Sequence, residues 1–165
     1  MNVRLRPAHE SDIPVLMNWF QTERECKTWG GPEFDFPFDR VSFTRDVKWP
    51  QLDSYSLVRP DDGLLGFGQY YEKQQRVHLA RLVVAPDFRG RGLGVELVGR
   101  LLETGREKLG RSDGSLYVME HNAAALSCYR SLGFELHPPP ENDVIHSGVV
   151  FMVLRSEPQT SVHPG

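Results

Sequence analysis

The sequence predicts a single α/β domain built on a sheet of mixed strand direction. Antiparallel extended segments come first along the chain and strand–helix–strand units follow, an order typical of this class. The 165 residues, 39% of them hydrophobic and 25% charged, suffice for one sizeable core and require no second domain. We expect the domain to span residues 1–155, and the polar, proline-containing residues 156–165 to form a disordered tail.

The N-terminal third is predicted to contain a strand, two helices and an aromatic loop. Residues 3–6 favour an opening strand. Ser11 and Asp12 are typical of a helix N-cap, and the helix that follows would bury the apolar side chains of Ile13, Val15, Leu16, Trp19 and Phe20. Residues 28–38 combine aromatic rings with glycine and proline, which predicts an irregular loop before a second short helix over residues 39–48.

The central part is predicted to form three strands. Residues 55–59 and 64–71 flank Pro60-Asp61-Asp62-Gly63, which favours a hairpin because proline presets one turn dihedral and glycine adopts a positive φ. Residues 76–84 carry β-branched and aliphatic side chains and predict the third strand. Pro86 ends that strand because proline lacks an amide hydrogen.

The C-terminal part is predicted to alternate helices and strands. Over residues 93–109 the apolar residues recur every three or four positions, which predicts an amphipathic helix. Residues 110–114 interrupt the helix, residues 115–120 predict a strand, and Asn122 opens another helix. Two short strands are predicted last, at residues 134–136 and 149–154.

The segment Arg89-Gly90-Arg91-Gly92-Leu93-Gly94 joins the strand predicted at residues 76–84 to the amphipathic helix predicted at residues 93–109. Free amides at a helix start, together with a dipole of about half a positive charge, attract an anion, and glycines let a pyrophosphate approach the backbone. The segment is not a P-loop, because Val95 and Glu96 stand where Lys and Ser or Thr would be, and its glycine spacing is not the dinucleotide-binding one. It therefore predicts a phosphate-binding loop of another kind.

Two segments resemble one known family. The pattern Arg-x-x-Gly-x-Gly at residues 89–94, preceded by Val84-Ala85-Pro86-Asp87-Phe88, resembles the acetyl-coenzyme A signature of the GCN5-related N-acetyltransferases (GNAT). Residues 122–134 resemble the second cofactor segment of that family, in which Asn122 opens a helix, Tyr129 follows seven residues later and Gly133-Phe134 comes next. The resemblance covers about residues 77–135 and implies a GNAT-like twisted, mostly antiparallel sheet flanked by helices.

The resemblance implies an N-acetyltransferase that moves an acetyl group from acetyl-coenzyme A to a primary amine by direct attack in a ternary complex. Tyr129 matches the tyrosine that serves as general acid, and a phenol of pKa about 10 stays protonated at pH 7 and can donate a proton to the coenzyme thiolate. No metal is implied. The expected cofactor-binding residues are Leu82, Val83 and Val84 through their main chain, with Arg89, Gly90, Arg91, Gly92, Leu93, Gly94, Asn122, Ala125 and Tyr129.

The general base departs from the family pattern. Where histone-type members carry a catalytic Glu this chain has His78, and where ribosomal-protein members carry one it has Tyr117. His78 is the expected base, because an imidazole of pKa about 6.5 can accept a proton at neutral pH. A structural role for His78 stays open. The strand pattern places His78 on the face of Ala80, Leu82 and Val84, and the substitute candidates are Glu72, Glu120 and His121.

The resemblance implies an acceptor site beside the first two helices. Trp29 and Phe34 of the aromatic loop, with Tyr117, are the candidate acceptor-binding residues, and three acidic residues would favour a cationic amine: Glu33, Asp35 and Asp39. Rings in such a loop equally serve to anchor it to the core. A small amine and a protein or peptide amine both stay open.

Composition limits the function classes. A net charge of −3 gives no reason to expect nucleic acid, and neither a membrane-spanning run nor a secretory leader is seen, so we expect a cytoplasmic protein with no membrane partner. Cys26 and Cys128 are expected to be reduced structural thiols. A homodimer is left open. The alternatives are a non-catalytic acyl-coenzyme A sensor or regulatory module and, less favoured, a nucleotide-dependent enzyme.

Overall fold

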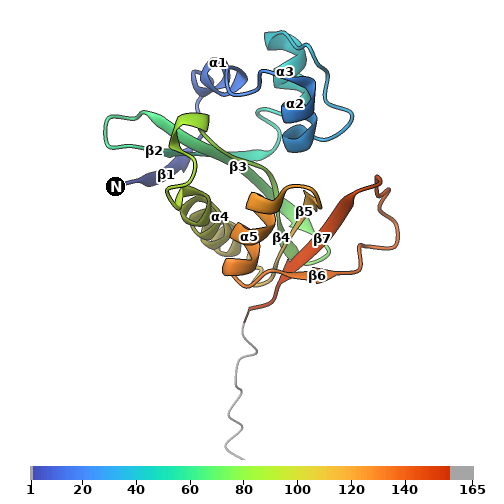
Figure 1. The fold of residues 1–165 in the computed structure, drawn as a ribbon. Helices are drawn as coiled ribbons and strands as arrows, with labels where there is room; N and C mark the ends of the chain where they lie inside the picture. The colour runs from blue at the N-terminus through green and yellow to red at the C-terminus, as the bar shows by residue number, and fades with distance from the viewer. Residues whose placement is uncertain (1, 157–165) are drawn as a thin grey trace, which may run out of the picture.

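The computed structural model describes residues 2–156 and shows one mixed α/β domain (Figure 1). Its sheet has seven strands in the order β1-β2-β3-β4-β5-β7-β6, and all neighbouring pairs are antiparallel except β4 and β5. The mixed, mostly antiparallel sheet predicted from the sequence is thereby confirmed. The strands are β1 (Arg4–Pro7), β2 (Asp53–Val58), β3 (Leu64–Lys73), β4 (Arg76–Val84), β5 (Gly114–Met119), β6 (Glu135–His137) and β7 (Val149–Leu154).

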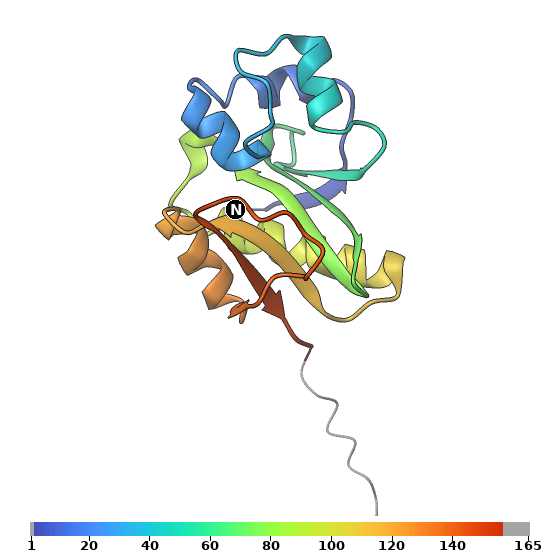
Figure 2. The ribbon, with the colours of Figure 1, turned by 90° about the vertical axis from the view of Figure 1, so that its right-hand side faces the viewer.

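Helices lie on both faces of the sheet (Figures 1 and 2). They are α1 (Asp12–Met17), α2 (Glu23–Gly30), α3 (Arg40–Asp46), α4 (Leu93–Leu109) and α5 (Ala123–Ser131), with a short 3₁₀ turn at Pro86–Phe88. Helix α4 packs on β3 and β4, and α5 lies beside α4. Helices α1, α2 and α3 pack with Phe67 and Val83 on the opposite face. None of these helices within residues 2–156 has the length and apolar character that a bilayer crossing requires.

A β-bulge in β4 changes which residues share a face. The register between β3 and β4 shifts between Phe67 and Gln69, and Arg81 adopts a left-handed backbone with φ of 49°. Beyond the bulge Leu82 points towards α4, where it lies close to Gly68, and Val84 joins the same side. The prediction that His78 shares a face with Leu82 and Val84 is therefore wrong, because the extra residue inverts the alternation.

Strands β4 and β5 pair over a short stretch and leave an opening. Their register joins Val77–Leu79 to Gly114–Leu116, with no pairing beyond. Both strands nevertheless continue, β4 to Val84 and β5 to Met119. The edge of β4 that faces β5 is therefore unpaired along its second half, and its main-chain groups are available to a ligand.

The N-terminal helices differ from prediction in several places. Helix α1 ends at Met17, so the buried Trp19 and Phe20 follow it rather than belong to it, and Val15 is 44% exposed because it points away from the core. Residues 28–30, expected in a loop, form the end of α2, whose N-cap Thr22 accepts a hydrogen bond from the amide of Glu25 at 3.1 Å. The glycine- and aromatic-rich composition obscured this helix. Ser11 makes no side-chain cap, and Asp12 lies in the first turn of α1 instead.

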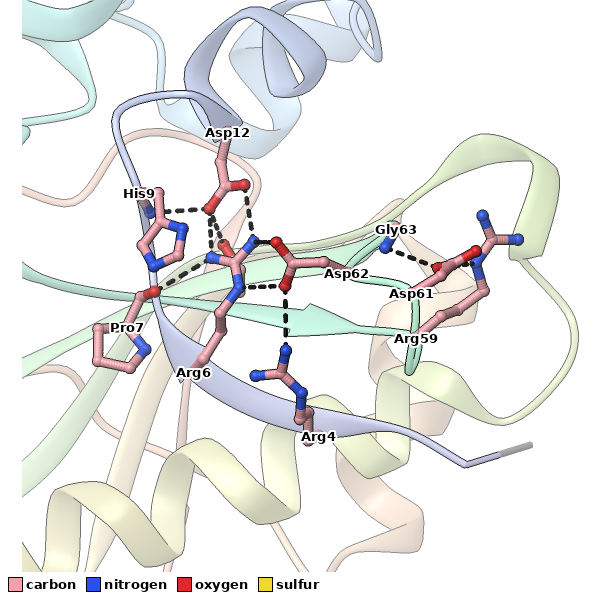
Figure 3. Close-up of polar contacts among 10 residues, drawn as sticks. Arg4, Arg6, Pro7, His9, Asp12, Arg59, Asp61, Asp62 and Gly63 are labelled. Atoms are coloured by element: carbon pink, nitrogen blue, oxygen red, sulfur yellow. Dashed lines mark hydrogen bonds and ion pairs between the residues drawn. The ribbon is translucent and has the colours of Figure 1, made fainter.

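Asp12 belongs to a buried ion-pair network that fastens α1 to β1 (Figure 3). Arg6 donates from Nη1 and Nη2 to the two Asp12 carboxylate oxygens at 2.7 and 3.0 Å. The carboxylate also accepts from the His9 amide and from Ser56 Oγ, both at 2.8 Å. Arg6 Nε reaches Asp62 in the β2–β3 turn at 2.8 Å. The network thus joins β1, β2, α1 and the hairpin turn.

The predicted tail lies almost entirely outside the described residues. Ser156 alone is described, and it donates from its amide and hydroxyl to Asp113 Oδ1 at 3.0 and 3.1 Å. Both cysteines are free thiols, Cys26 buried and Cys128 half-buried.

Candidate active site

A cavity of about 790 Å³ occupies the opening between β4 and β5. It runs from the glycine loop and the start of α4, past the second half of β4, to α2 on the other face of the sheet. Residues 79–84, 117–119 and 121–125 line it along the strands and the start of α5. The divergence of two neighbouring strands therefore connects the predicted phosphate loop with the predicted acceptor side.

The glycine loop ends in a helix start with free amides. The first intrahelical bond runs from Glu96 N to Gly92 O at 3.3 Å, and no side chain caps the helix, so the earlier amides remain available. Gly90 and Gly92 have φ of 77° and 79°, a backbone that only glycine adopts without strain. These free amides and the positive end of α4 suit a phosphate group.

The two loop arginines have different surroundings. Arg89 lines the cavity and its Nε donates to the Val84 carbonyl at 3.2 Å. Arg91 is absent from the cavity lining and places its guanidinium 5.1 Å from the Phe88 ring centroid. Arg91 thus packs on the 3₁₀ turn, and Arg89 lies at the predicted cofactor channel.

Helix α5 presents two predicted residues to the cavity. Asn122 is its N-cap and accepts a hydrogen bond from the Ala125 amide at 3.2 Å, which sets where the helix begins. Tyr129, 8% exposed, lines the cavity two turns later and packs against Phe134. Burial raises the pKa of the Tyr129 phenol, so the hydroxyl keeps its proton at neutral pH.

His78 lies outside the cavity lining, in a buried aromatic cluster. It is 2% exposed, its Nδ1 is 2.8 Å from Ser115 Oγ, and the rings of Tyr71, Tyr117 and Phe151 surround it. Burial lowers the pKa of His78 to about 4, helped by the charge of Lys73. A neutral imidazole of such low basicity, away from the cavity, is poorly placed to take a proton directly from an amine.

Tyr117 does line the cavity, and its hydroxyl is held from the far side. It donates to Asp143, which also forms an ion pair with Lys73 at 2.8 Å. Asp143 belongs to the segment 138–148, which connects β6 to β7 and passes over the face of the sheet (Figure 2). Hydrogen bonding to Lys73 and Tyr117 keeps the pKa of the Asp143 carboxyl below its usual range.

The predicted acceptor residues separate into two groups. Trp29 lines the cavity and stacks on Phe20 with ring centroids 4.3 Å apart. Phe34, 3% exposed, lies in the core between Trp29 and Phe43 and does not reach the cavity. Phe34 thus anchors the segment after α2, as large apolar side chains usually do.

The acidic residues expected to attract a cationic amine have other structural roles. Asp35 pairs with Arg45, Asp39 caps α3, and none of Glu33, Asp35 and Asp39 lines the cavity. The charged side chains that the sequence prediction missed and the cavity contains are Arg24, Glu25 and Arg81. The available sequence signal for Arg81 was a charged residue between apolar neighbours in the second half of the strand.

The family comparison agrees with this geometry. Residues 15–134 match the family described as acetyltransferase (GNAT). The chain is 31% identical over 75 residues to a thialysine N-epsilon-acetyltransferase of Bos taurus, covering 42% of this chain and 44% of that protein. It is 37% identical over 112 residues to a mycothiol acetyltransferase of Mycolicibacterium vanbaalenii, covering 58% and 34%. The chain thus spans less than half the length of these relatives.

Solved structures share the fold at low sequence identity. The spermidine N-acetyltransferase of Vibrio cholerae, solved with CoA and spermine, superposes with a TM-score of 0.69 at 17% identity, covering 92% of this chain and 94% of that one. The ribosomal-protein-S18-alanine N-acetyltransferase of Escherichia coli superposes with a TM-score of 0.64 at 20% identity, covering 96% and 98%. The single mixed α/β domain with helices on both faces is their shared architecture.

Proposed function

Because the chain belongs to the acetyltransferase (GNAT) family, we propose that it transfers an acetyl group from acetyl-coenzyme A to a primary amine. The observation that carries this proposal is the cavity between β4 and β5, which joins the glycine loop to Tyr129 and Trp29. The names of the similar proteins support an amine acceptor, since they specify spermidine, the alanine of a ribosomal protein and thialysine.

The residues present fit coenzyme A. The free amides at the start of α4 would hold the diphosphate, and Arg89 at the cavity wall would add charge. The unpaired edge of β4 at Leu82, Val83 and Val84 would bind the amide groups of the pantetheine arm. Position rather than side-chain type decides these contacts, because they use the main chain.

Tyr129 would act as the general acid. The reaction forms a bond from the amine nitrogen to the acetyl carbon and breaks the carbon–sulfur bond, so the departing thiolate needs a proton. The buried phenol of Tyr129 retains its proton and lines the cavity, and can supply it. When bound, acetyl-coenzyme A supplies the activated acyl group.

The proton acceptor for the amine is the less defined part of the proposal. Of the three substitute candidates Glu72, Glu120 and His121, His121 is the one that lines the cavity. We favour His121, acting directly or through water, over His78. A lysine-type amine of pKa about 10.4 is neutral in about one of two thousand molecules at pH 7, so such an acceptor depends strongly on a base, whereas an α-amine near 7.8 does not.

Acceptor-dependent release of free thiol from acetyl-coenzyme A tests the function. Purified protein is incubated with acetyl-coenzyme A and a panel of amines, with matched reactions that lack amine or protein. Thiol release that requires an amine, with an N-acetylated product of the expected mass, supports the transferase. Tight calorimetric binding of acetyl-coenzyme A without release across the panel supports the sensor alternative, and the absence of binding contradicts both. Greater thermal stabilisation by ATP or NAD than by coenzyme A would favour a nucleotide enzyme.

The contribution of His121 is tested on the same assay. His121→Ala should lower kcat/KM for an amine of high pKa more than for one of low pKa. It should also shift the pH profile of kcat/KM to higher pH. His78→Ala with an altered profile, and His121→Ala without one, would reverse the assignment.

A further inference from the structure

Arg81 stands out because it is a charged residue at the bulge, between the apolar residues Ala80 and Leu82. Its left-handed φ of 49° is uncommon outside glycine, and the register shift opposite Gly68 turns the chain there. Bulges next to active sites often re-aim a side chain. Here the re-aimed side chain lines the cavity directly before Leu82, where the expected pantetheine contacts begin.

A buried hydrogen-bond chain holds the guanidinium in one place. Arg81 Nη1 donates to Gln69 Oε1 at 3.0 Å. Gln69, which is fully buried, donates from Nε2 to the Val47 carbonyl at 2.7 Å and to Ser54 Oγ at 2.9 Å. Because both Nε2 contacts are acceptors fixed by the fold, the amide oxygen is directed at Arg81. The arginine is therefore oriented before any ligand arrives.

Most of the hydrogen-bonding capacity of Arg81 is unused by the protein. Nε is buried without a partner among residues 2–156, and Arg81 takes part in no ion pair of that region. Asp46, the acidic residue that acts on it electrostatically, is bonded to Arg45 and to the Asp35 amide. Burial lowers the pKa of Arg81. A desolvated cation with free donors is costly unless a ligand anion pairs with it.

The cavity is basic overall. Three arginines line it, Arg24, Arg81 and Arg89, against one acidic residue, Glu25, within the described chain. Arg89 lies at the phosphate loop, whereas Arg81 is bonded to Gln69, whose amide contacts Val47 of the cluster that includes Trp29. The acceptor side thus carries a fixed cation instead of the acidic cluster that a polyamine would need.

We propose that Arg81 binds a carboxylate of the amine acceptor, so that the substrate is a small amino-acid-like molecule carrying both an amine and a carboxylate. This rests on the proposed transferase function and specifies its substrate class. Gln69 accepts one hydrogen of Nη1, and the second Nη1 hydrogen and the Nη2 hydrogens have no partner among residues 2–156. This end of the planar guanidinium matches the two oxygens of a carboxylate. The Gln69 contact holds the guanidinium in place, and Trp29 adds an apolar ring to the lining of the same cavity.

Binding of matched ligand pairs tests the proposal without requiring turnover. Calorimetry is done on the protein saturated with coenzyme A, with each of the common L-amino acids, β-alanine and γ-aminobutyrate against the corresponding amide. Cadaverine and spermidine serve as amines without a carboxylate, and phosphoethanolamine serves as the phosphate arm. We expect at least one acid to bind at least ~10-fold tighter than its amide, as for a charge-assisted bidentate contact.

Two variants and a control separate recognition from folding. In Arg81→Gln the acid-to-amide ratio should fall below about 2, and Arg81→Lys, which keeps the charge but not the fork, should give an intermediate ratio. Coenzyme A affinity should be unchanged in both. Arg100→Gln, which removes a half-buried arginine paired with Glu96 on α4 and outside the cavity lining, should leave the ratio as in the original protein. Arg81→Lys keeps the test decisive if the Gln variant does not fold.

Each other outcome has a defined meaning. Amides or cadaverine binding as tightly as the acids, no acid binding at all, or an unchanged ratio in both Arg81 variants would overturn the carboxylate assignment. Phosphoethanolamine binding tighter than every acid would assign Arg81 to a phosphate instead. If the acids bind through Arg81 but no thiol is released, the transferase function fails and the assignment of Arg81 stands.

Discussion

The two ends of the cavity are built by different means. At the proposed cofactor end the groups available for binding are main-chain amides of the glycine loop and the unpaired edge of β4. At the proposed acceptor end they are side chains: Trp29 on α2, which packs against Phe67 of β3, and Arg81 on the bulge, which is bonded to Gln69. The first end is a local motif, and the second exists only after the helices and the sheet have packed.

This difference determines how each end responds to mutation. A main-chain site is sensitive to φ and tolerant of side-chain type, whereas a side-chain site depends on the network behind it. Substitutions can therefore impair one end of the cavity and leave the other unchanged, with effects of different size.

The largest effect is expected from the ion pair that fastens α1 on the acceptor side. Asp12→Asn would leave Arg6, 7% exposed, charged without its buried partner, and should lower the free energy of unfolding by about 3–5 kcal/mol. Urea denaturation at pH 7 measures this. Asp62→Asn is the matched control, because Asp62 is the exposed partner of Arg6, and its loss should lower the free energy of unfolding much less than the loss of Asp12. Equal losses in both would contradict the dominance of the buried contact.

Tyr129→Phe tests the chemistry at the cofactor end. Removing the proton donor while keeping the ring should lower kcat by about 100-fold, within the range typical of general acid catalysis, and leave acetyl-coenzyme A affinity within about 2-fold. Steady-state kinetics with calorimetry gives both numbers. A kcat that hardly changes would remove Tyr129 from the mechanism.

The buried His78 predicts a pH dependence of stability. Its pKa is lowered to about 4 in the folded chain from 6.5 in the unfolded chain, so the unfolded state binds the proton first as pH falls. The stabilisation is complete above pH 6.5 and declines towards pH 4, by about 2 kcal/mol between pH 7 and pH 4.5.

His78→Gln, which can keep the contact to Ser115, should flatten this decline when unfolding is measured at both pH values. His146→Gln, at an exposed histidine, should retain it. If the stability of His78→Gln falls with pH as steeply as that of the original protein, groups other than His78 cause the acid sensitivity.

Gly92→Ala is expected to give the smallest effect. The positive φ of 79° should cost about 1–2 kcal/mol of stability and weaken coenzyme A binding, although a Cβ there meets no atom within 4 Å. Gly99→Ala, in the same helix with equally open space, should instead stabilise the protein by about 0.5–1 kcal/mol. Thermal or urea unfolding of the pair distinguishes backbone strain from crowding.

The sequence allowed prediction of those features that local chemistry determines. The strand–turn–helix at residues 84–94, the Asn122 cap and the strand at residues 149–154 follow from proline, glycine and hydrophobic spacing, and all are present. The bulge at Arg81 could not be predicted, because it depends on how β3 and β4 are packed, and with it the face of Leu82 and Val84 was assigned wrongly.

The acceptor side was harder to predict for the same reason. Phe34 and Trp29 belong to the same predicted aromatic loop, yet packing buries the first and places the second at the cavity. Asp12 was expected to cap a helix, but its bond to Arg6 depends on β1 lying next to α1. Contacts between distant segments decide these roles, and hydrophobic periodicity does not encode them.

Only three residue pairs connect β4 to β5 in the described structure, so the sheet consists of two unequal parts, β1 to β4 and β5 to β7. In the first part, β1, β2, β3 and β4 are neighbours in that order, and local hairpins join β2 to β3 and β3 to β4. In the second part, β7 lies between β5 and β6. A ligand bound between β4 and β5 contacts both parts of the sheet and links them. Amide hydrogen exchange should then slow in β6 and β7, far from the bound ligand, because opening that part of the sheet would require the ligand to dissociate.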